Sequence, residues 1–271
     1  MTSRKHYWIN GTERVSFLQD LISQNVNNMA VNDICWGALL TPQGRILADF
    51  FLLAYRENCW WLDVDARVAD DLLRQLYLYR MRRDVKIEEH DGHVVTSAEP
   101  LTNGVIDPRL PVMGWRCYQH DSNLRHGDTA QETEAHYRLR RIQNGVPEGP
   151  DALPMREAML IDSGFVELNG LSLTKGCFVG QEVTARVYYR GLVKRRLVPV
   201  KADGELYIGD ALFGKDGKEI GRVREVAGDG WGLAYVRRAA LEEQMLTTQG
   251  LTVDAKIPSW FHWNPKDGQS N

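Results

Sequence analysis

The chain has 271 residues, more than one hydrophobic core usually organises, which predicts two or three subdomains. Its apolar content of 43% and charged content of 25% are ordinary for a soluble globular protein, and its net charge of -3 argues against a general nucleic-acid binder. The four cysteines are widely spaced, so neither a disulfide framework nor a metal site held by this chain alone is expected. The N-terminus lacks an apolar leader and no run is long enough to span a membrane, so a cytoplasmic location is expected.

The first part of the chain predicts an α+β layer. An amphipathic helix is expected from Val15 to Ile22 with Thr12 as its cap. The apolar runs 35–40 and 46–55 flank a Pro- and Gly-containing turn, which predicts a β-hairpin. A strand over 59–64, a helix over 68–79 and a strand over 85–88 follow, and this order favours α+β over a doubly wound parallel sheet.

The second part predicts a barrel. Strands are expected at 93–96 and 115–119, then a helix over 131–144 and a Pro/Gly loop over 145–150. Short strands at 197–201, 206–208, 219–226 and 231–236, with Asp-Gly turns between them, indicate a small antiparallel β-barrel. We therefore expect two α+β subdomains in 1–196 with a break between 90 and 130, a barrel in 197–262, and a frayed tail in 263–271.

The segment Lys175-Gly176-Cys177-Phe178-Val179-Gly180-Gln181-Glu182 has the composition of a site. A thiol becomes a nucleophile or a soft ligand as thiolate, and Lys175 or Arg186 nearby favours that form. If a helix begins near Gln181, Glu182 and Arg186 share one of its faces. The alternative is that Cys177 is a small buried hydrophobic residue in a turn.

This segment resembles the signature of the YgfZ family, folate-binding proteins that assist iron-sulfur cluster assembly or repair and are related to the aminomethyltransferase (T protein) of glycine cleavage. Further segments resemble the same family in the same order, so the likeness runs from about residue 10 to 240. They are Leu40-Thr41-Pro42-Gln43-Gly44-Arg45, Leu62-Asp63-Val64-Asp65, Leu78-Tyr79-Arg80-Met81-Arg82-Arg83, Asp107-Pro108-Arg109, Gly114-Trp115-Arg116 and Gly145-Val146-Pro147-Glu148-Gly149.

The resemblance implies an aminomethyltransferase-like fold, with three subdomains around a central folate cavity and tetrahydrofolate or a derivative as cofactor. By a gapless count from Lys175, Asp162 takes the place of the carboxylate that binds the pterin in the aminomethyltransferases. Glu157 is the alternative, because Asp162 lacks the family's preceding proline and is shorter than its glutamate. The implied folate contacts also include Gln181, Glu182, Arg186 and Arg190.

Three functions are weighed on this basis. The leading one is a tetrahydrofolate-binding accessory factor for iron-sulfur cluster assembly or repair, with Cys177 and Lys175 as its chemical groups, client enzymes or assembly proteins as partners, and an associated link to tRNA modification. The alternative is a folate-dependent one-carbon transferase or demethylase in which Asp71 or Asp162 does acid-base work, so whether the chain is an enzyme stays open. The third is an interaction module in which residues 186–196 dock an acidic partner or RNA; membrane or direct nucleic-acid binding is not expected.

Overall fold

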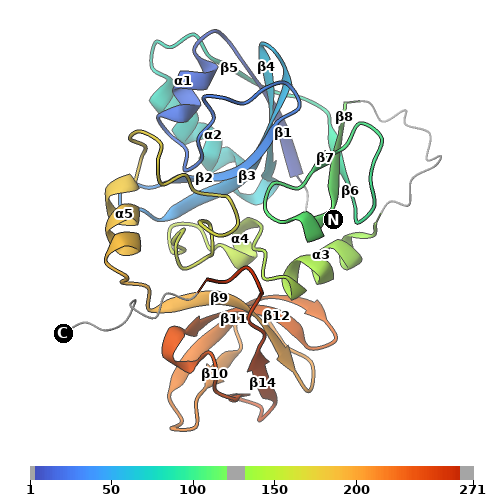
Figure 1. The fold of residues 1–271 in the computed structure, drawn as a ribbon, viewed down its shortest axis with the longest axis vertical. Coiled ribbons are helices and arrows are strands. Elements are labelled where there is room, and N and C mark those ends of the chain that lie inside the picture. Colours follow the sequence, from blue (N-terminus) through green and yellow to red (C-terminus); the bar gives the residue numbers. More distant parts are fainter. Residues whose placement is uncertain (1–3, 121–131, 263–271) are drawn as a thin grey trace.

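The computed structural model describes residues 4–120 and 132–262 of the chain. It has three units: an antiparallel five-stranded sheet with its helices, a three-stranded sheet, and a closed antiparallel barrel (Figure 1). The five-stranded sheet and the barrel lie at opposite ends of the molecule, with the helices α3 (Glu134–Gln143) and α4 (Gly149–Ala152) between them. This arrangement confirms the predicted α+β class and the C-terminal barrel. The residue bounds of the subdomains remain predictions.

The first unit is a sheet in the order β2-β3-β4-β1-β5 with all neighbours antiparallel. The predicted hairpin is confirmed, and Gly44 in its turn has a φ of 74°, which glycine adopts without strain. The unit comprises β1 (Arg4–Asn10), α1 (Arg14–Gln19), β2 (Ile34–Leu40), β3 (Ile46–Arg56), β4 (Cys59–Asp65), α2 (Ala66–Arg80) and β5 (Lys86–Glu89).

Two features of this unit differ from the prediction. The pattern does not predict β1, because its residues Arg4 and His6 look like surface positions but face charged partners inside the protein. Helix α1 ends at Gln19, before the predicted Ile22, and Thr12 is not its cap. The Thr12 hydroxyl instead donates a hydrogen bond to the Asp84 carboxylate at 2.7 Å, so it ties the start of α1 to the segment before β5.

The middle of the chain forms a small sheet in the order β6-β8-β7 and then returns through helices toward the barrel. Thr133 caps α3 by accepting a hydrogen bond from the main chain of His136. The predicted helix began at 131, a residue outside those described. The elements are β6 (His93–Ser97), β7 (Val105–Ile106), the short 3-10 helix η1 (Pro111–Met113), β8 (Trp115–Gln119), α3, α4 and α5 (Gln181–Tyr189).

The barrel closes in the order β10-β11-β12-β9-β14-β13. The Asp229-Gly230 turn joins β11 and β12 with positive φ at both residues, as such hairpins require. The strand predicted at 206–208 is wrong: Leu206 is buried, but Tyr207 and Ile208 are exposed in a turn. The predicted tail at 263–271 lies outside the described residues. The elements are β9 (Arg195–Ala202), β10 (Ala211–Phe213), β11 (Glu219–Gly228), β12 (Trp231–Arg237), η2 (Arg238–Ala240), β13 (Met245–Thr247) and β14 (Thr252–Ala255).

The two faces of the first sheet pack against different apolar clusters. One cluster fills the space between the sheet and the helices α1 and α2. The other lies on the opposite face and joins the sheet to α3, α4, residues 158–171 and the barrel, with Trp36 and Phe165 stacked at 3.9 Å between ring centroids. Because the second cluster includes residues from the sheet, the connecting segments and the barrel, it fixes the sheet relative to the barrel.

Candidate functional site

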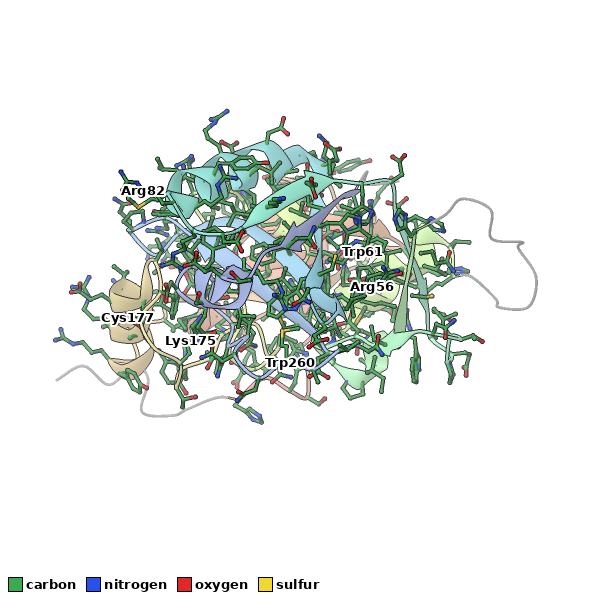
Figure 2. All side chains as sticks on the ribbon, turned by 90° about the horizontal axis from the view of Figure 1, so that it is seen from above. Arg56, Trp61, Arg82, Lys175, Cys177 and Trp260 are labelled. Carbon is green, nitrogen blue, oxygen red and sulfur yellow. The ribbon has the colours of Figure 1, made fainter. Side chains whose placement is uncertain are left out.

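The cysteine segment spans the two apolar clusters just before α5. Phe178 is buried in the second cluster, and its neighbour Val179 packs against the first. Cys177 is exposed, and in Figure 2 it lies at the edge of the molecule beside α5. Burial of the two residues that follow it therefore anchors the segment and leaves the thiol facing solvent. The alternative of a buried structural cysteine is wrong.

Two glycine turns hold this segment against the first sheet. Gly180 precedes α5 with a φ of 79°, and a Cβ placed there would lie 2.7 Å from the carbonyl oxygen of Thr41. A Cβ on Gly44 would lie 3.0 Å from that of Val183 on α5. Both positions need glycine for conformation and for space. The hairpin turn and the cysteine segment, which are far apart in the sequence, thus form one packed unit.

Lys175 is buried, and its ammonium group is hydrogen-bonded to the main chain. Its Nζ donates to the carbonyl oxygens of Ile22 and Gln24 at 2.7 and 2.8 Å, and burial lowers its pKa to about 8. It also lies 5.3 Å from the centroid of the Phe178 ring. These contacts tie the cysteine segment to the loop after α1. No hydrogen bond joins Lys175 to Cys177 in the described part of the chain, so its predicted effect on the thiol stays a prediction.

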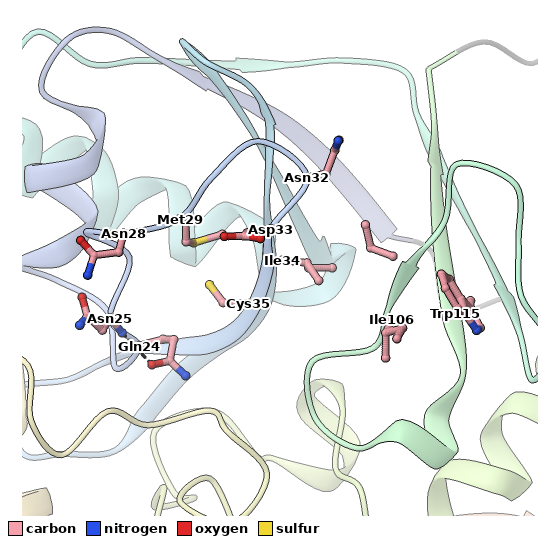
Figure 3. A pocket seen from close by; sticks show the side chains of 11 residues that line it. Gln24, Asn25, Asn28, Met29, Asn32, Asp33, Ile34, Cys35, Ile106 and Trp115 are labelled. Atoms are coloured by element: carbon pink, nitrogen blue, oxygen red, sulfur yellow. Dashed lines mark hydrogen bonds between the residues drawn. The ribbon is translucent and has the colours of Figure 1, made fainter.

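The other three cysteines are less accessible than Cys177. Cys35 and Cys117 are buried and Cys59 is partly buried. Burial raises the pKa of all three thiols, to about 12 for Cys35. Cys35 lines a cavity of about 570 Å³ between residues 24–35 and β7, together with amide side chains such as that of Asn28 (Figure 3). At neutral pH the Cys35 thiol is therefore protonated and a poorer nucleophile than an exposed thiol.

Asp162 lies in a second cavity, of about 600 Å³, between the 154–162 segment and the barrel. Burial raises the pKa of its carboxyl to about 6, against the opposing charges of Arg196, Arg45 and Arg195. Its carboxylate makes no hydrogen bond or ion pair with any described residue. An ionised, partly buried acceptor without a partner is thus available to a ligand.

The wall of this cavity has more arginines than carboxylates, and it carries Glu157, the alternative pterin carboxylate, as well as Glu219, which pairs with Arg222. Glu157 is exposed, and its main-chain carbonyl accepts a hydrogen bond from the Arg45 guanidinium at 2.7 Å. The two candidate carboxylates therefore line the same cavity rather than different ones. Five arginines share this wall: Arg45, Arg195, Arg222, Arg224 and Arg237.

The other predicted folate contacts lie on α5 and do not line the Asp162 cavity. Gln181 donates to the carbonyl oxygen of Gly176 at 3.4 Å, and Glu182, Arg186 and Arg190 are exposed. Glu182 and Arg186 share the outer face of the helix as predicted, without an ion pair between them. The structure thus separates the predicted residues into an outer helix and an inner cavity, with the hairpin turn between them. Asp71, considered for acid-base work, pairs with Arg74 on α2.

Several family-like motifs meet in a buried ion network. Arg109 is fully buried and bonds Asp107 at 2.7 Å and Glu148 at 2.8 Å, while Arg116 bonds Asp63 at 3.0 Å. Arg4 also pairs with Asp63 and Glu148, so three arginines face three carboxylates. The Arg116 guanidinium lies 3.7 Å from the centroid of the Phe51 ring. The motifs carry no local sign of this common place, since only the fold brings 4, 63, 107–116 and 148 together.

Two cavities border this network: one of about 760 Å³ runs along Arg4, His6 and His90, and the other is much smaller. The cavity along Arg4, Tyr137 and Glu148 has a volume of about 40 Å³, far less than the roughly 300 Å³ or more of typical ligand sites. The Asp162 cavity is large enough, offers a carboxylate for a two-donor pterin edge, and offers arginines for a glutamate tail. The residues of the Asp162 cavity fit a folate-type ligand, whereas the small cavity along Arg4, Tyr137 and Glu148 does not have room for one.

Among residues 4–120 and 132–262, no group of three or more His, Cys, Asp or Glu side chains is placed to hold a metal ion. None of the helices in the same ranges has both the length and the apolarity needed to cross a membrane.

Comparison with known proteins identifies the fold. Residues 194–263 match the model of the CAF17 C-terminal beta-barrel domain. The whole structure is similar to that of the glycine cleavage system aminomethyltransferase T from Bartonella henselae, with a TM-score of 0.73 and 15% identity over 96% of this chain and 84% of that one. The chain is therefore an α+β protein of the glycine cleavage T-protein fold with a C-terminal β-barrel, as expected.

Sequence comparison identifies the family. The mitochondrial iron-sulfur cluster assembly factors IBA57 of Mus musculus and Homo sapiens are 32% and 30% identical to this chain, in each case over 82% of it and 71% of the relative. The mitochondrial homolog of Mycosarcoma maydis is 31% identical over 71% of this chain, which spans about half (54%) of that relative. The chain belongs to the IBA57 family of iron-sulfur cluster assembly factors.

These relatives correct one expectation and leave others as predictions. The expected cytoplasmic location is wrong by this comparison, since the names of all three relatives place them in mitochondria. The family shown is IBA57, so the narrower YgfZ assignment stays a resemblance. Folate binding and the link to tRNA modification also remain predictions.

Proposed function

We propose that this chain takes part in iron-sulfur cluster assembly and that Cys177 supplies one thiolate ligand to a cluster that a partner also holds. A role in cluster assembly is supported by the relatives, which are named iron-sulfur cluster assembly factors. The choice of Cys177 as the ligand rests on its exposure, because it is the one exposed cysteine among the four. A packed turn and a buried lysine fix the segment that presents it.

The proposed chemistry is ligand exchange on iron. One thiolate cannot hold a cluster, because such clusters normally take several, so a client or carrier supplies the remaining ligands. The Cys177 sulfur forms a bond to iron as a thiolate of the incoming complex leaves, and the proton lost by Cys177 passes to the departing thiolate through solvent. Iron and sulfide keep their oxidation states, so the step needs no reductant.

A [2Fe-2S] cluster ligated by glutathione tests this proposal. Wild-type protein should bind the cluster by exchange for a glutathione thiolate, seen as a change in visible absorption and circular dichroism. The Cys177→Ser variant should lose this signal, while Cys59→Ser, which alters a partly buried thiol, should keep it. An equal signal from Cys177→Ser would overturn the role of this thiol.

We also propose that the Asp162 cavity binds tetrahydrofolate. The unpartnered carboxylate, the cationic wall and the cavity volume support this ligand. Asp162 would accept from the amino and ring N-H groups of the pterin, and the arginines would pair with the glutamate tail. Titration of wild type, Asp162→Asn and Glu157→Gln tests it: a weakening only in Asp162→Asn assigns the pterin to Asp162, and equal affinity in all three proteins rejects the site.

A further inference from the structure

The helix that follows Cys177 has an outward face made of exposed side chains. On α5 the side chains facing the protein include Val183, which lies against Gly44, Thr184, which is buried, and Val187, which packs against the second apolar cluster. Arg186, Tyr189 and Arg190 are all exposed, and Tyr189 has 71% of its surface accessible. We call this surface, extended by Leu192 and Lys194, the α5 face. It begins directly after the segment that presents the thiol.

The α5 face has an excess of positive charge that no described residue neutralises. Arg186, Arg190 and Lys194 make no side-chain hydrogen bond or ion pair with any residue in 4–120 or 132–262. Glu182 is the single acidic residue between 175 and 196, and it forms no ion pair there either. The nearby Arg196, by contrast, is paired with Glu167 at 2.6 Å. A chain with a net charge of -3 thus concentrates free cations next to its one exposed thiol.

A cationic surface of this kind is complementary in charge to a thiolate-ligated iron-sulfur cluster. A cluster bound entirely by cysteine thiolates is anionic, because the thiolate charges outweigh the iron and sulfide core. Fixed cations beside a reactive group raise the local concentration of an anionic ligand and its rate of encounter. The exposed tyrosines Tyr188 and Tyr189, whose rings meet edge to face at 5.2 Å, add residues of the type enriched at interfaces.

We propose that the α5 face is the docking surface for an acidic, thiolate-ligated iron-sulfur cluster complex and steers it toward Cys177. This inference rests on the proposed function of Cys177 and adds the chemical class of the partner. Arg186 and Arg190 then act on the incoming cluster complex at the surface, rather than on a folate in the Asp162 cavity.

The rate of exchange onto Cys177 tests the surface. With the glutathione-ligated [2Fe-2S] cluster at low salt, Arg186→Glu/Arg190→Glu should slow the second-order exchange by about tenfold or more, and added salt should slow the wild type toward the same rate. The control Lys215→Glu/Lys218→Glu makes the same change of net charge in the turn between β10 and β11 and should leave the rate within about twofold. A cluster ligated by the ethyl ester of glutathione, with fewer carboxylates, should show a smaller loss in the α5 variant.

The outcomes separate this inference from the function on which it rests. If wild type exchanges the cluster onto Cys177 and the α5 variant does so equally fast with the same salt dependence, the docking surface is overturned and the thiol role stands. If both charge variants slow the rate equally, overall charge rather than the α5 face is responsible, which also overturns it. If wild type shows no exchange at all, the proposed role of Cys177 fails first.

Discussion

Replacing Glu148 by glutamine tests whether the buried ion network holds the three units together. The carboxylate accepts from Arg109 at 2.8 Å, from Arg4 at 3.2 Å and from the hydroxyl of Tyr137 at 2.8 Å. The substitution keeps the shape but leaves the three arginines of the network facing two carboxylates. Removing one partner from a buried pair costs about 3–5 kcal/mol, since the remaining charge stays buried without compensation.

The assay is urea unfolding of wild type, Glu148→Gln and the exposed control Glu99→Gln at neutral pH. We expect Glu148→Gln to lower the free energy of unfolding by about 3–5 kcal/mol and Glu99→Gln by less than about 0.5 kcal/mol. A loss below about 1 kcal/mol for Glu148→Gln would refute the reasoning, because it would show that solvent screens the network as it screens surface pairs.

The same carboxylate gives a pH dependence of defined sign. Burial opposes ionisation of Glu148, but the charges of Arg109, Arg4 and Arg116 outweigh it and hold its pKa well below the ordinary value of 4.5. A lowered folded pKa means that this stabilisation is complete above about pH 4.5 and is lost as the pH falls below it. Wild type should therefore lose stability on acidification through this range more steeply than Glu148→Gln. Parallel curves would contradict the assignment.

Three further predictions concern the cysteine segment and the cavity. Gly180→Ala should lower the free energy of unfolding by about 1–3 kcal/mol, since the new methyl group strains a positive φ and meets a carbonyl oxygen. The control Gly176→Ala has open space around it and should lower the free energy of unfolding by less than about 0.5 kcal/mol in the same urea assay. Similar losses for the two variants would refute the packing of Gly180. Iodoacetamide should alkylate Cys177 in the native protein and Cys35 only after unfolding, as peptide mass spectrometry would show, and early labelling of Cys35 would contradict its burial. Tetrahydrofolate affinity should fall as the pH drops through about 6 in wild type and stay flat in Asp162→Asn, because only the ionised carboxylate accepts from the pterin; a flat wild-type profile would remove Asp162 from the site.

Local patterns predict the elements that carry a strong local signal. The hairpin of β2 and β3 follows from two apolar runs around a Pro/Gly turn. A helix near Gln181 is the condition for Glu182 and Arg186 to share a face, and α5 begins at that residue. The Asp-Gly turn at 229 and the spacing of the strands around it predict the barrel. These features depend on neighbours in sequence, so they can be read without the fold.

What the sequence does not predict depends on distant partners. The start of strand β1 looks like a surface segment because Arg4 pairs with carboxylates as distant as Asp63 and Glu148. The Asp162 cavity takes its arginines from the hairpin and from the barrel, which no local pattern connects. Likewise, the composition around Cys177 indicates a reactive thiol, but it does not reveal that Lys175 is bound to the main chain of the loop after α1.

The most direct test of the central claim is made in cells that depend on this protein for their iron-sulfur enzymes. Chains carrying Cys177→Ser or Cys59→Ser would replace the wild type, and the activity of iron-sulfur enzymes would be measured at equal levels of the folded variants. The account predicts loss of these activities with Cys177→Ser and normal activities with Cys59→Ser. Full activity with Cys177→Ser would contradict the claim that this exposed thiol ligates the cluster.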